Sequence, residues 1–213
     1  MRWGGLYRLD PVSRVFGFDR GKPIDRYYIE HFLKANVDKI RGRVLEVGDS
    51  RYTNTLGGDR VSRSDVLHAR PGNAAATLIG DLTTGEGMPL ETFDCFILTQ
   101  TLPYIFDVRA AVKNCSAVLR TGGALLATFP GISQISRYDM DRWGDYWRFT
   151  SLSARKLFEE VFPARNVCIK TYGNVLAGIA FLHGISSEEI MQSDLDYIDL
   201  DYQLLIAVCA IKD

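Results

Sequence analysis

The sequence has few of the residues that metal, redox or nucleic-acid chemistry needs. It contains 4 cysteines and 3 histidines among 213 residues, and neither type shows the paired spacing of zinc sites or dithiol centres. Each cysteine stands among apolar neighbours, so we expect no metal site and buried thiols at Cys95, Cys115, Cys168 and Cys209. The formal net charge of -1 lacks the basic excess of proteins that neutralise many phosphates, so we expect no nucleic-acid partner.

The sequence also lacks an apolar run long enough to cross a membrane. Its most apolar stretch, "VLAGIAFLHGI", is shorter than the roughly 20 residues that a span needs. The first residues, "MRWGGLYRLDP", have no apolar segment behind their charge, so we expect no secretory signal, no membrane partner and a cytoplasmic location. With 46% hydrophobic and 24% charged residues, the chain is typical of one folded domain over residues 1–213. Its oligomeric state, monomer or homodimer, stays open.

Segments of strand and helix character alternate along the chain. "PIDRYYIEHFLKANVDKI" has helical spacing and precedes the apolar strand "RVLEV". Two weaker strands end at "SDV" and "GDL", and the stronger "FDCFILT" ends at Thr99. Asp107 can cap the next helix, which Gly122 and Gly123 end before the strand "ALLATF". This order predicts a parallel sheet covered by helices.

Two segments fall outside this alternation. Residues 1–22 form an N-terminal extension. Residues 130–150, "PGISQISRYDMDRWGDYWRFT", form an aromatic and charged insertion that holds two of the three tryptophans. We expect this insertion to build the pocket for a substrate. A helix from Ser151 and two further strands, "NVCIKTY" and "YQLLIAVCAIK", complete the pattern.

Polar residues stand at the ends of successive predicted strands. Glu46 lies in the first strand, Asp65 ends the second and Asp81 ends the third, while Thr99 and Gln100 end the fourth. Ligands bind beyond the carboxyl ends of the strands in open parallel sheets, so these positions predict a shared site. A carboxylate at Asp65 can accept hydrogen bonds from ribose hydroxyls, and Asp81 can accept one from an adenine amino group.

The turn after the first strand, "VLEVGDSRY", contains one glycine, Gly48. Dinucleotide-binding turns use three glycines because the backbone must approach a pyrophosphate closely. A ligand without phosphates does not require that approach. S-adenosylmethionine, which offers an adenosine, an amino acid and a sulfonium, is such a ligand.

On these motifs, the chain resembles the class I S-adenosylmethionine-dependent methyltransferases, and within them the small-molecule group. "VLEVGDS", "SDVLH", "GDL", "FDCFILTQTL" and "LRTGGALLATFPG" correspond to the first five strand regions of that family. The resemblance implies an α/β fold, a Rossmann-like three-layer sandwich with a mostly parallel seven-stranded sheet and an antiparallel last strand. It also implies S-adenosyl-L-methionine as cofactor. The short "SRYTNTLGG" departs from the family and argues against a full helix after the first strand.

The resemblance assigns the cofactor to ten residues around the strand ends. They are Glu46, Gly48, Asp49, Ser50, Asp65, Val66, Asp81, Leu82, Thr99 and Gln100.

Transfer of a methyl group from a sulfonium is an in-line displacement on an activated donor, so alignment of the acceptor supplies much of the acceleration. A hydroxyl acceptor must also lose its proton, and the candidate bases are Asp139, Asp145 and His183, with Asp141 as a further carboxylate nearby. The opposite interpretation of His183 is a packed, hydrogen-bonded side chain.

The insertion offers stacking walls and cations for a polar acceptor. The candidate acceptor residues are Arg137, Tyr138, Trp143, Tyr146, Trp147 and Arg148, with Arg142 between them. The alternative is that the tryptophans cover the sheet edge while the charges pair with one another. We expect methyl transfer to a polar small molecule, a hydroxyl of a saccharide or secondary metabolite, although the residues do not distinguish oxygen from nitrogen or carbon as the acceptor atom.

Two rival functions share the predicted sheet. A nicotinamide-dependent oxidoreductase needs phosphate-binding glycines and a proton donor, and Tyr138 with Arg142 does not supply the usual Tyr-x-x-x-Lys pair. A non-catalytic scaffold or regulatory partner would keep the methyltransferase fold without the reaction, and the missing turn glycines favour it. Loss of cofactor binding would distinguish that scaffold from an enzyme.

Overall fold

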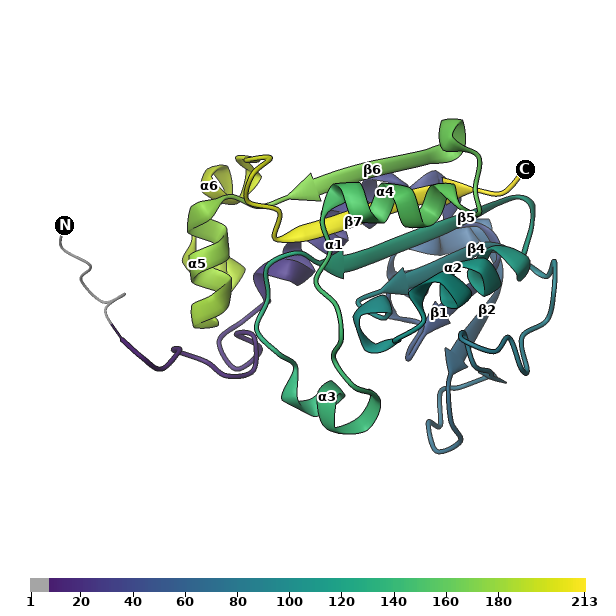
Figure 1. Cartoon of the computed structure of the whole chain (residues 1–213), viewed down its shortest axis with the longest axis horizontal. Coiled ribbons are helices and arrows are strands. Elements are labelled where there is room, and N and C mark those ends of the chain that lie inside the picture. Colours follow the sequence, from purple (N-terminus) through teal and green to yellow (C-terminus); the bar gives the residue numbers. More distant parts are fainter. Residues whose placement is uncertain (1–7) are drawn as a thin grey trace.

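The computed structural model describes residues 8–213, so the first seven residues of the predicted extension 1–22 lie outside the described part. The helices are α1 (Ile24–Ala35), α2 (Val108–Ala117), α3 (Arg137–Trp143), α4 (Ser151–Glu159), α5 (Val175–His183) and α6 (Gln192–Asp196). The strands are β1 (Gly42–Val47), β2 (Val61–His68), β3 (Leu78–Ile79), β4 (Phe93–Thr99), β5 (Leu119–Pro130), β6 (Val167–Tyr172) and β7 (Leu205–Ile211). Figure 1 shows their arrangement along the chain.

The strands form one seven-stranded sheet in the order β3-β2-β1-β4-β5-β7-β6. The pairs among β1 to β5 are parallel, and β7 runs antiparallel to both β5 and β6. This confirms the predicted Rossmann-like sandwich with an antiparallel last strand. The chain builds outward from β1 to β3 and then crosses to β4, so the strand order reverses between β1 and β4. Ligands of open α/β sheets bind at such a switch point.

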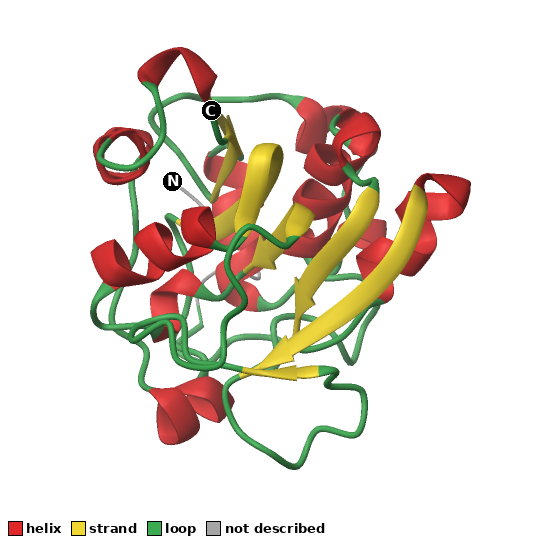
Figure 2. Ribbon diagram, turned by 90° about the vertical axis from the view of Figure 1, so that its right-hand side faces the viewer, coloured by secondary structure: helices red, strands yellow, loops and turns green. Residues whose placement is uncertain are grey.

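Helices cover both faces of the sheet, which makes the three layers visible in Figure 2. On one face, α2 and α4 bury residues such as Val112 and Phe158 against Phe96 of the sheet. On the other face, α1, α5 and α6 bury residues such as Phe32 and Phe181 against the opposite side chains of the same strands. Burial of both faces explains why the central strands are almost uninterrupted apolar runs.

Some element boundaries differ from the sequence prediction. Strand β2 continues to His68, beyond the predicted end at "SDV", because residues 65–67 still pair with β1. Strand β5 begins at Leu119 and runs through Gly122 and Gly123, so these glycines do not separate helix from strand. Asp107 does cap α2, accepting a hydrogen bond from the Ala110 N–H at 3.0 Å.

The segment after β1 is helical but irregular. Residues 51–60 form a continuous helical stretch that includes a π-helix at Thr53–Gly57 and a 3-10 helix at Gly58–Arg60, so this segment departs from a regular α-helix in its geometry. Of the four cysteines, Cys168 is exposed, which corrects the prediction that all four are buried. In the part of the chain that the structure describes, no helix is long and apolar enough to span a membrane.

Candidate functional site

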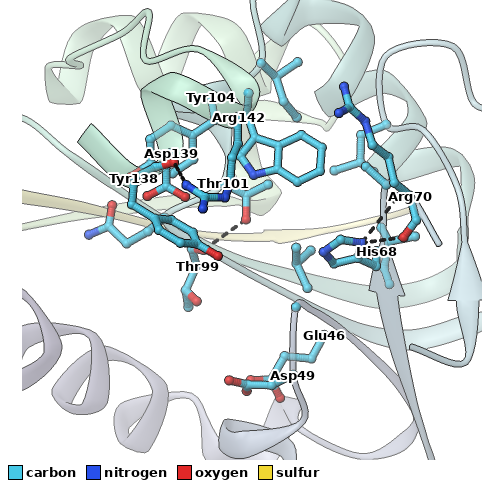
Figure 3. A pocket seen from close by; sticks show the side chains of 18 of the residues that line it. Glu46, Asp49, His68, Arg70, Thr99, Thr101, Tyr104, Tyr138, Asp139 and Arg142 are labelled. Atoms are coloured by element: carbon cyan, nitrogen blue, oxygen red, sulfur yellow. Dashed lines mark hydrogen bonds between the residues drawn. The ribbon is translucent and has the colours of Figure 1, made fainter. Parts of the chain in front are cut away.

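A cavity of about 1140 Å³ lies beyond the carboxyl ends of β1, β2 and β4. Its walls come from the turn after β1, the end of β2, residues 80–83, residues 99–106 and α3. In Figure 3, Tyr138, Asp139 and Arg142 of α3 lie across the cavity from Glu46 and Asp49, while His68 and Arg70 form a third side. The cavity therefore occupies the position at which open parallel sheets bind their ligands.

The predicted residues divide into those that line this cavity and those that do not. Among the predicted cofactor residues, the lining includes Glu46, Gly48, Asp49, Asp81, Leu82, Thr99 and Gln100. Among the predicted acceptor and base residues, it includes Tyr138, Asp139, Asp141, Arg142, Trp143 and Tyr146.

Gly48 gives the turn after β1 its shape. Its φ of 84° lies in the left-handed region, and a Cβ placed on it would meet no atom within 4 Å. The Gly48 N–H donates to the Leu67 carbonyl at 2.9 Å, and the Gly48 carbonyl accepts from Asn73 Nδ2 at 2.7 Å. The turn is thus fixed on the protein side and open on the cavity side, which suits close approach of a ligand to the backbone.

Glu46 braces this turn from inside the sheet. Its carboxylate accepts hydrogen bonds from the backbone N–H groups of Tyr52 at 3.1 Å and Thr53 at 2.8 Å, and from Thr53 Oγ1 at 2.7 Å. The side chain is 2% exposed. Burial raises the pKa of Glu46 more than these hydrogen bonds lower it. Glu46 holds the turn in place, and this bracing lets a turn with one glycine keep its conformation.

Asp65 does not reach the cavity, which corrects its assignment to a ribose. Its carboxylate accepts from Arg43 Nε at 2.7 Å, from Arg63 Nη2 at 3.1 Å and from Thr77 Oγ1 at 3.1 Å. Burial alone would raise the pKa of Asp65, but these three donors together hold it below its usual value. Asp65 pairs with Leu45 across the sheet, whereas Glu46 pairs with Val66, so the two carboxylates point to opposite faces.

The end of β2 is instead occupied by His68, which lines the cavity. Its Nδ1 lies 2.7 Å from the Arg70 carbonyl oxygen. Sequence reasoning did not assign this residue to the site because it placed the end of β2 too early. Ser50 and Val66, also predicted for the cofactor, lie outside the lining. Ser50 Oγ accepts from Asn54 Nδ2 at 3.0 Å, and Val66 is buried in β2 at 4% exposure.

Asp81 and Leu82 enter the cavity just after the short strand β3. Asp81 Oδ1 accepts from the Thr83 N–H at 2.6 Å, and Asn114 Nδ2 donates to the Leu82 carbonyl at 2.8 Å. These bonds fix the segment as a wall. The role of Asp81 toward an adenine stays a prediction.

Gln100, at the end of β4, has a φ of 49°, which is uncommon for a residue with a side chain. Its N–H donates to the Thr128 carbonyl at 2.8 Å, and its Nε2 lies 3.4 Å from Asp25 Oδ2 of α1. Asp25 is 9% exposed, and its Oδ1 has no partner among the described residues. Burial raises the pKa of the Asp25 carboxyl more than nearby Arg26 lowers it. Helix α1 is therefore tied to the cavity edge, where Arg26 also lines the wall.

Helix α3 forms the side of the cavity that carries the residues predicted to bind the acceptor. Ser136 caps it, accepting from the Asp139 N–H, while the Ser136 hydroxyl donates to Asp139 Oδ2 at 2.5 Å. The Arg142 guanidinium lies 3.6 Å from the centre of the Tyr138 ring. Across the cavity mouth, the Arg70 guanidinium lies 4.7 Å from the Trp143 ring centre. These contacts link α3 to the loop after β2.

Several predicted acceptor residues have structural roles outside the cavity. Trp147 Nε1 donates to the carbonyls of Ile105 at 3.1 Å and Phe106 at 3.2 Å. Arg148 pairs with Asp145 through bonds of 2.6 and 3.0 Å. Arg137 is exposed and lies 3.9 Å from Asp141. The structure thus supports the alternative of mutual pairing for part of the insertion.

Two of the three candidate bases are corrected by the structure. The Asp145 side chain is 1% exposed, bound by Arg148 and by the Ser136 N–H at 3.0 Å, and it lies outside the cavity lining. His183 ends α5, where its carbonyl accepts from Val12 and Ser13, and it too lies outside the lining. Among the three, the structure brings Asp139 to the cavity.

Several further residues of the lining were not predicted, because they come from separate segments of the chain and carry no common motif. They include Phe18, Arg26, Tyr52, Arg70, Thr101 and Tyr104. Burial raises the pKa of Tyr104, and the neighbouring Asp139 raises it further. Within residues 8–213, no group of three or more histidine, cysteine or acidic side chains is placed to hold a metal ion.

Solved structures share this fold at low sequence identity. One is a SAM-dependent methyltransferase from Archaeoglobus fulgidus, 13% identical, with a TM-score of 0.57 over 88% of this chain and 94% of that chain. Another is the N-methyltransferase NodS from Bradyrhizobium japonicum WM9 in complex with S-adenosyl-L-homocysteine, 14% identical, with a TM-score of 0.55 over 95% of each chain. A third is the cyclase SpnF, 14% identical, with a TM-score of 0.54 over 87% of this chain and 80% of that chain. No protein-family model and no curated protein sequence matches the chain.

Proposed function

Because the chain has the class I methyltransferase fold, we propose that the protein transfers a methyl group from S-adenosyl-L-methionine to a polar small molecule. The observation that carries the proposal is the cavity beyond β1, β2 and β4, where the backbone at Gly48 is open to a ligand. The likeness to NodS, whose structure contains S-adenosyl-L-homocysteine, supports the choice of ligand.

The residues present fit this cofactor. Asp49, Asp81 and Gln100 offer polar groups at three separate strand ends, and Leu82 offers an apolar contact beside Asp81. The turn has no need to bind a pyrophosphate, which agrees with its one glycine. We assign the cofactor to Gly48, Asp49, Asp81, Leu82, Thr99 and Gln100, with Glu46 as the brace of the turn.

The bound cofactor would supply an activated methyl group, so the protein must align the acceptor and take up its proton. Asp139 is our candidate for the base. The Ser136 hydroxyl holds one of its carboxylate oxygens at 2.5 Å, and the residue lies in the cavity wall formed by α3.

The acceptor we propose is a hydroxyl of a saccharide or secondary metabolite. Tyr138, Trp143 and Tyr146 give this side of the cavity aromatic surfaces, on which a sugar ring can stack. Arg142 adds a cation beside Tyr138 that can bind a polar or acidic substituent. A cytoplasmic location and a monomeric or homodimeric state are further predictions from the sequence.

A second function is a non-catalytic or differently reacting protein with the same fold. The likeness to the cyclase SpnF supports this alternative, because one fold hosts unrelated reactions. An alternative of this kind that binds the cofactor without transferring its methyl group would differ from the proposed enzyme in turnover alone.

Two linked measurements separate these possibilities. Isothermal titration with S-adenosylhomocysteine tests the cofactor, with NADH as the control ligand. Incubation with methyl-labelled S-adenosylmethionine and a panel of saccharides and phenolic metabolites tests the reaction. Binding with labelled product supports the enzyme. Binding without product from any acceptor supports the alternative, and absence of binding rejects the cofactor assignment.

A further inference from the structure

We propose that His68 forms the ribose contact of the cofactor site, with its Nε2 accepting a hydrogen bond from a ribose hydroxyl. The inference rests on the cofactor proposed above. Rossmann-like folds usually place a carboxylate there, at the end of the second strand. In this chain the carboxylate of β2, Asp65, is bound by Arg43 and Arg63 on the opposite face of the sheet.

The position of His68 follows from the pairing of β1 with β2. Glu46 pairs with Val66 and Val47 with Leu67, so His68 comes level with Gly48 at the end of the strand. Side chains alternate between faces along a strand, so His68 shares the face of Glu46 and not that of Asp65. Its carbonyl accepts from the Gly80 N–H at 3.1 Å, which anchors the strand end beside the adenine-side segment.

The hydrogen bonding of the ring selects its chemistry. Nδ1 lies 2.7 Å from the Arg70 carbonyl oxygen, which can only accept, and 3.3 Å from the Arg70 backbone nitrogen, whose N–H can only donate. We assign the proton to Nδ1 because the contact with the carbonyl oxygen is the shorter of the two. In a neutral imidazole, Nε2 is then unprotonated and acts as an acceptor. Within residues 8–213, no hydrogen bond to Nε2 is formed by the protein. His68 therefore presents to the cavity one acceptor of the kind that a carboxylate oxygen would supply.

The ring is also held from the other side of the cavity. Its centre lies 5.8 Å from that of Trp143, with the two planes at 76°. The Arg70 guanidinium lies 4.7 Å from the same Trp143 ring. Figure 3 shows the bond between His68 and Arg70 that fixes one end of the ring. Backbone and aromatic contacts together orient the imidazole before any ligand binds.

The test compares dissociation constants for S-adenosylhomocysteine, measured by isothermal titration, in wild type and three variants. His68→Ala should bind about 3- to 13-fold more weakly, the loss expected for one neutral hydrogen bond. His68→Gln should stay within about twofold of wild type, because its Oε1 can replace Nε2 as acceptor. Asp65→Asn, the matched control, should bind as wild type does. Circular dichroism checks that each variant is folded.

Analogues of the ligand separate loss of the ribose contact from an effect of the substitution on the fold. Analogues of S-adenosylhomocysteine with a 2′-deoxy or a 3′-deoxy ribose should lose affinity for wild type. The analogue that lacks the hydroxyl bound by His68 should bind equally to wild type and to His68→Ala, because the hydrogen bond is already absent. The proposal is overturned if folded His68→Ala binds S-adenosylhomocysteine as wild type does, or if Asp65→Asn loses the affinity instead. Absence of binding by wild type would reject the cofactor itself, a separate result.

Discussion

Glu46 and Asp65 lie on the adjacent strands β1 and β2, and each is 2% exposed. Glu46 accepts hydrogen bonds from the turn that borders the cavity. Asp65 accepts from Arg43 and Arg63, away from the cavity. The comparison shows that strand position alone does not assign a ligand role, because a shift of one residue moves a side chain to the other face.

The two carboxyls also have opposite electrostatic settings. Burial raises the pKa of Glu46, whose hydrogen-bond donors, the N–H groups of Tyr52 and Thr53 and the Thr53 hydroxyl, are uncharged. Two arginines and Thr77 overcome burial and lower the pKa of Asp65. Stability and ligand binding should therefore respond differently to changes at these two residues.

The largest contrast is expected from Glu46→Ala and Asp65→Ala. Removal of Glu46 leaves two backbone N–H groups and one hydroxyl without their acceptor, at a cost of about 2 to 4 kcal/mol in the free energy of unfolding. The turn at Gly48 then loosens, and binding of S-adenosylhomocysteine should fall below detection. Asp65→Ala should cost about 1 to 3 kcal/mol and keep wild-type affinity. Urea denaturation and isothermal titration measure both quantities, and equal losses of affinity would remove the distinction.

A second contrast uses two glycines with positive φ and open space at the Cβ position, Gly48 and Gly58. Alanine should cost about 1 to 2 kcal/mol of stability at Gly48 through backbone strain. It should cost about 1 to 3 kcal/mol at Gly58, whose φ of 54° and ψ of -145° only glycine readily adopts. Gly48→Ala also places a methyl group where the ligand should lie, which should weaken binding by roughly 5- to 150-fold. Gly58 lies outside the cavity lining, so Gly58→Ala should bind normally. Similar affinities in both variants would place the ligand elsewhere.

The pH dependence of stability gives a smaller effect of opposite sign for the two carboxyls. The lowered pKa of Asp65 contributes stability above its unfolded value of about 3.9, and this is lost as pH falls through the folded pKa. The advantage of wild type over Asp65→Asn should therefore shrink in acid. The raised pKa of Glu46 contributes stability below its unfolded value of about 4.3, lost as pH rises through the folded pKa.

As pH rises, the free energy of unfolding of wild type should therefore decrease relative to that of Glu46→Gln. Over the same range it should increase relative to that of Asp65→Asn. Urea denaturation between about pH 3 and 7 measures both slopes. This range brackets the unfolded pKa values of roughly 3.9 and 4.3. Slopes of the same sign would show that one of the two carboxyl environments is misassigned.

The smallest effect on the cofactor is expected from Trp143→Ala. The substitution removes the contacts of α3 with His68 and Arg70 but leaves the turn at Gly48 intact. Affinity for S-adenosylhomocysteine should change by less than about threefold, the scale of one weak aromatic contact. Hydrogen exchange in residues 137–143 should become faster. Unchanged exchange would mean that other contacts, such as the Ser136 cap, hold the helix alone.

Much of the fold could be predicted from the sequence because local patterns determine it. The apolar strands, the Asp107 cap and the glycine at the first turn all act over a few residues. The role of Asp65 was missed because it depends on the end of β2 and on Arg43 from a neighbouring strand. Arg63, two residues earlier on the same face, was the one local sign that Asp65 has an ion-pair partner.

The predicted acceptor side shows the same limit. Aromatic and charged residues cluster in the insertion, and some of them, such as Tyr138, Trp143 and Tyr146, line the cavity, while their role toward an acceptor stays a proposal. Sequence alone could not separate Asp139, in the wall, from Asp145, which Arg148 holds outside it. That difference arises from the direction of each side chain on and after a short helix, and His183 was likewise placed by the packing of α5.

Binding of S-adenosylmethionine in the cavity beyond β1, β2 and β4, as we propose, can be measured by thermal unfolding with S-adenosylhomocysteine. Ligand at a hundred times its dissociation constant stabilises a protein by about 2.7 kcal/mol. For a chain of this size the midpoint should rise by about 5 to 11 °C in wild type and in Gly58→Ala, and by less in Gly48→Ala at the same ligand concentration. No rise in wild type at millimolar ligand, or an equal rise in all three proteins, would show that the cofactor does not bind at this turn.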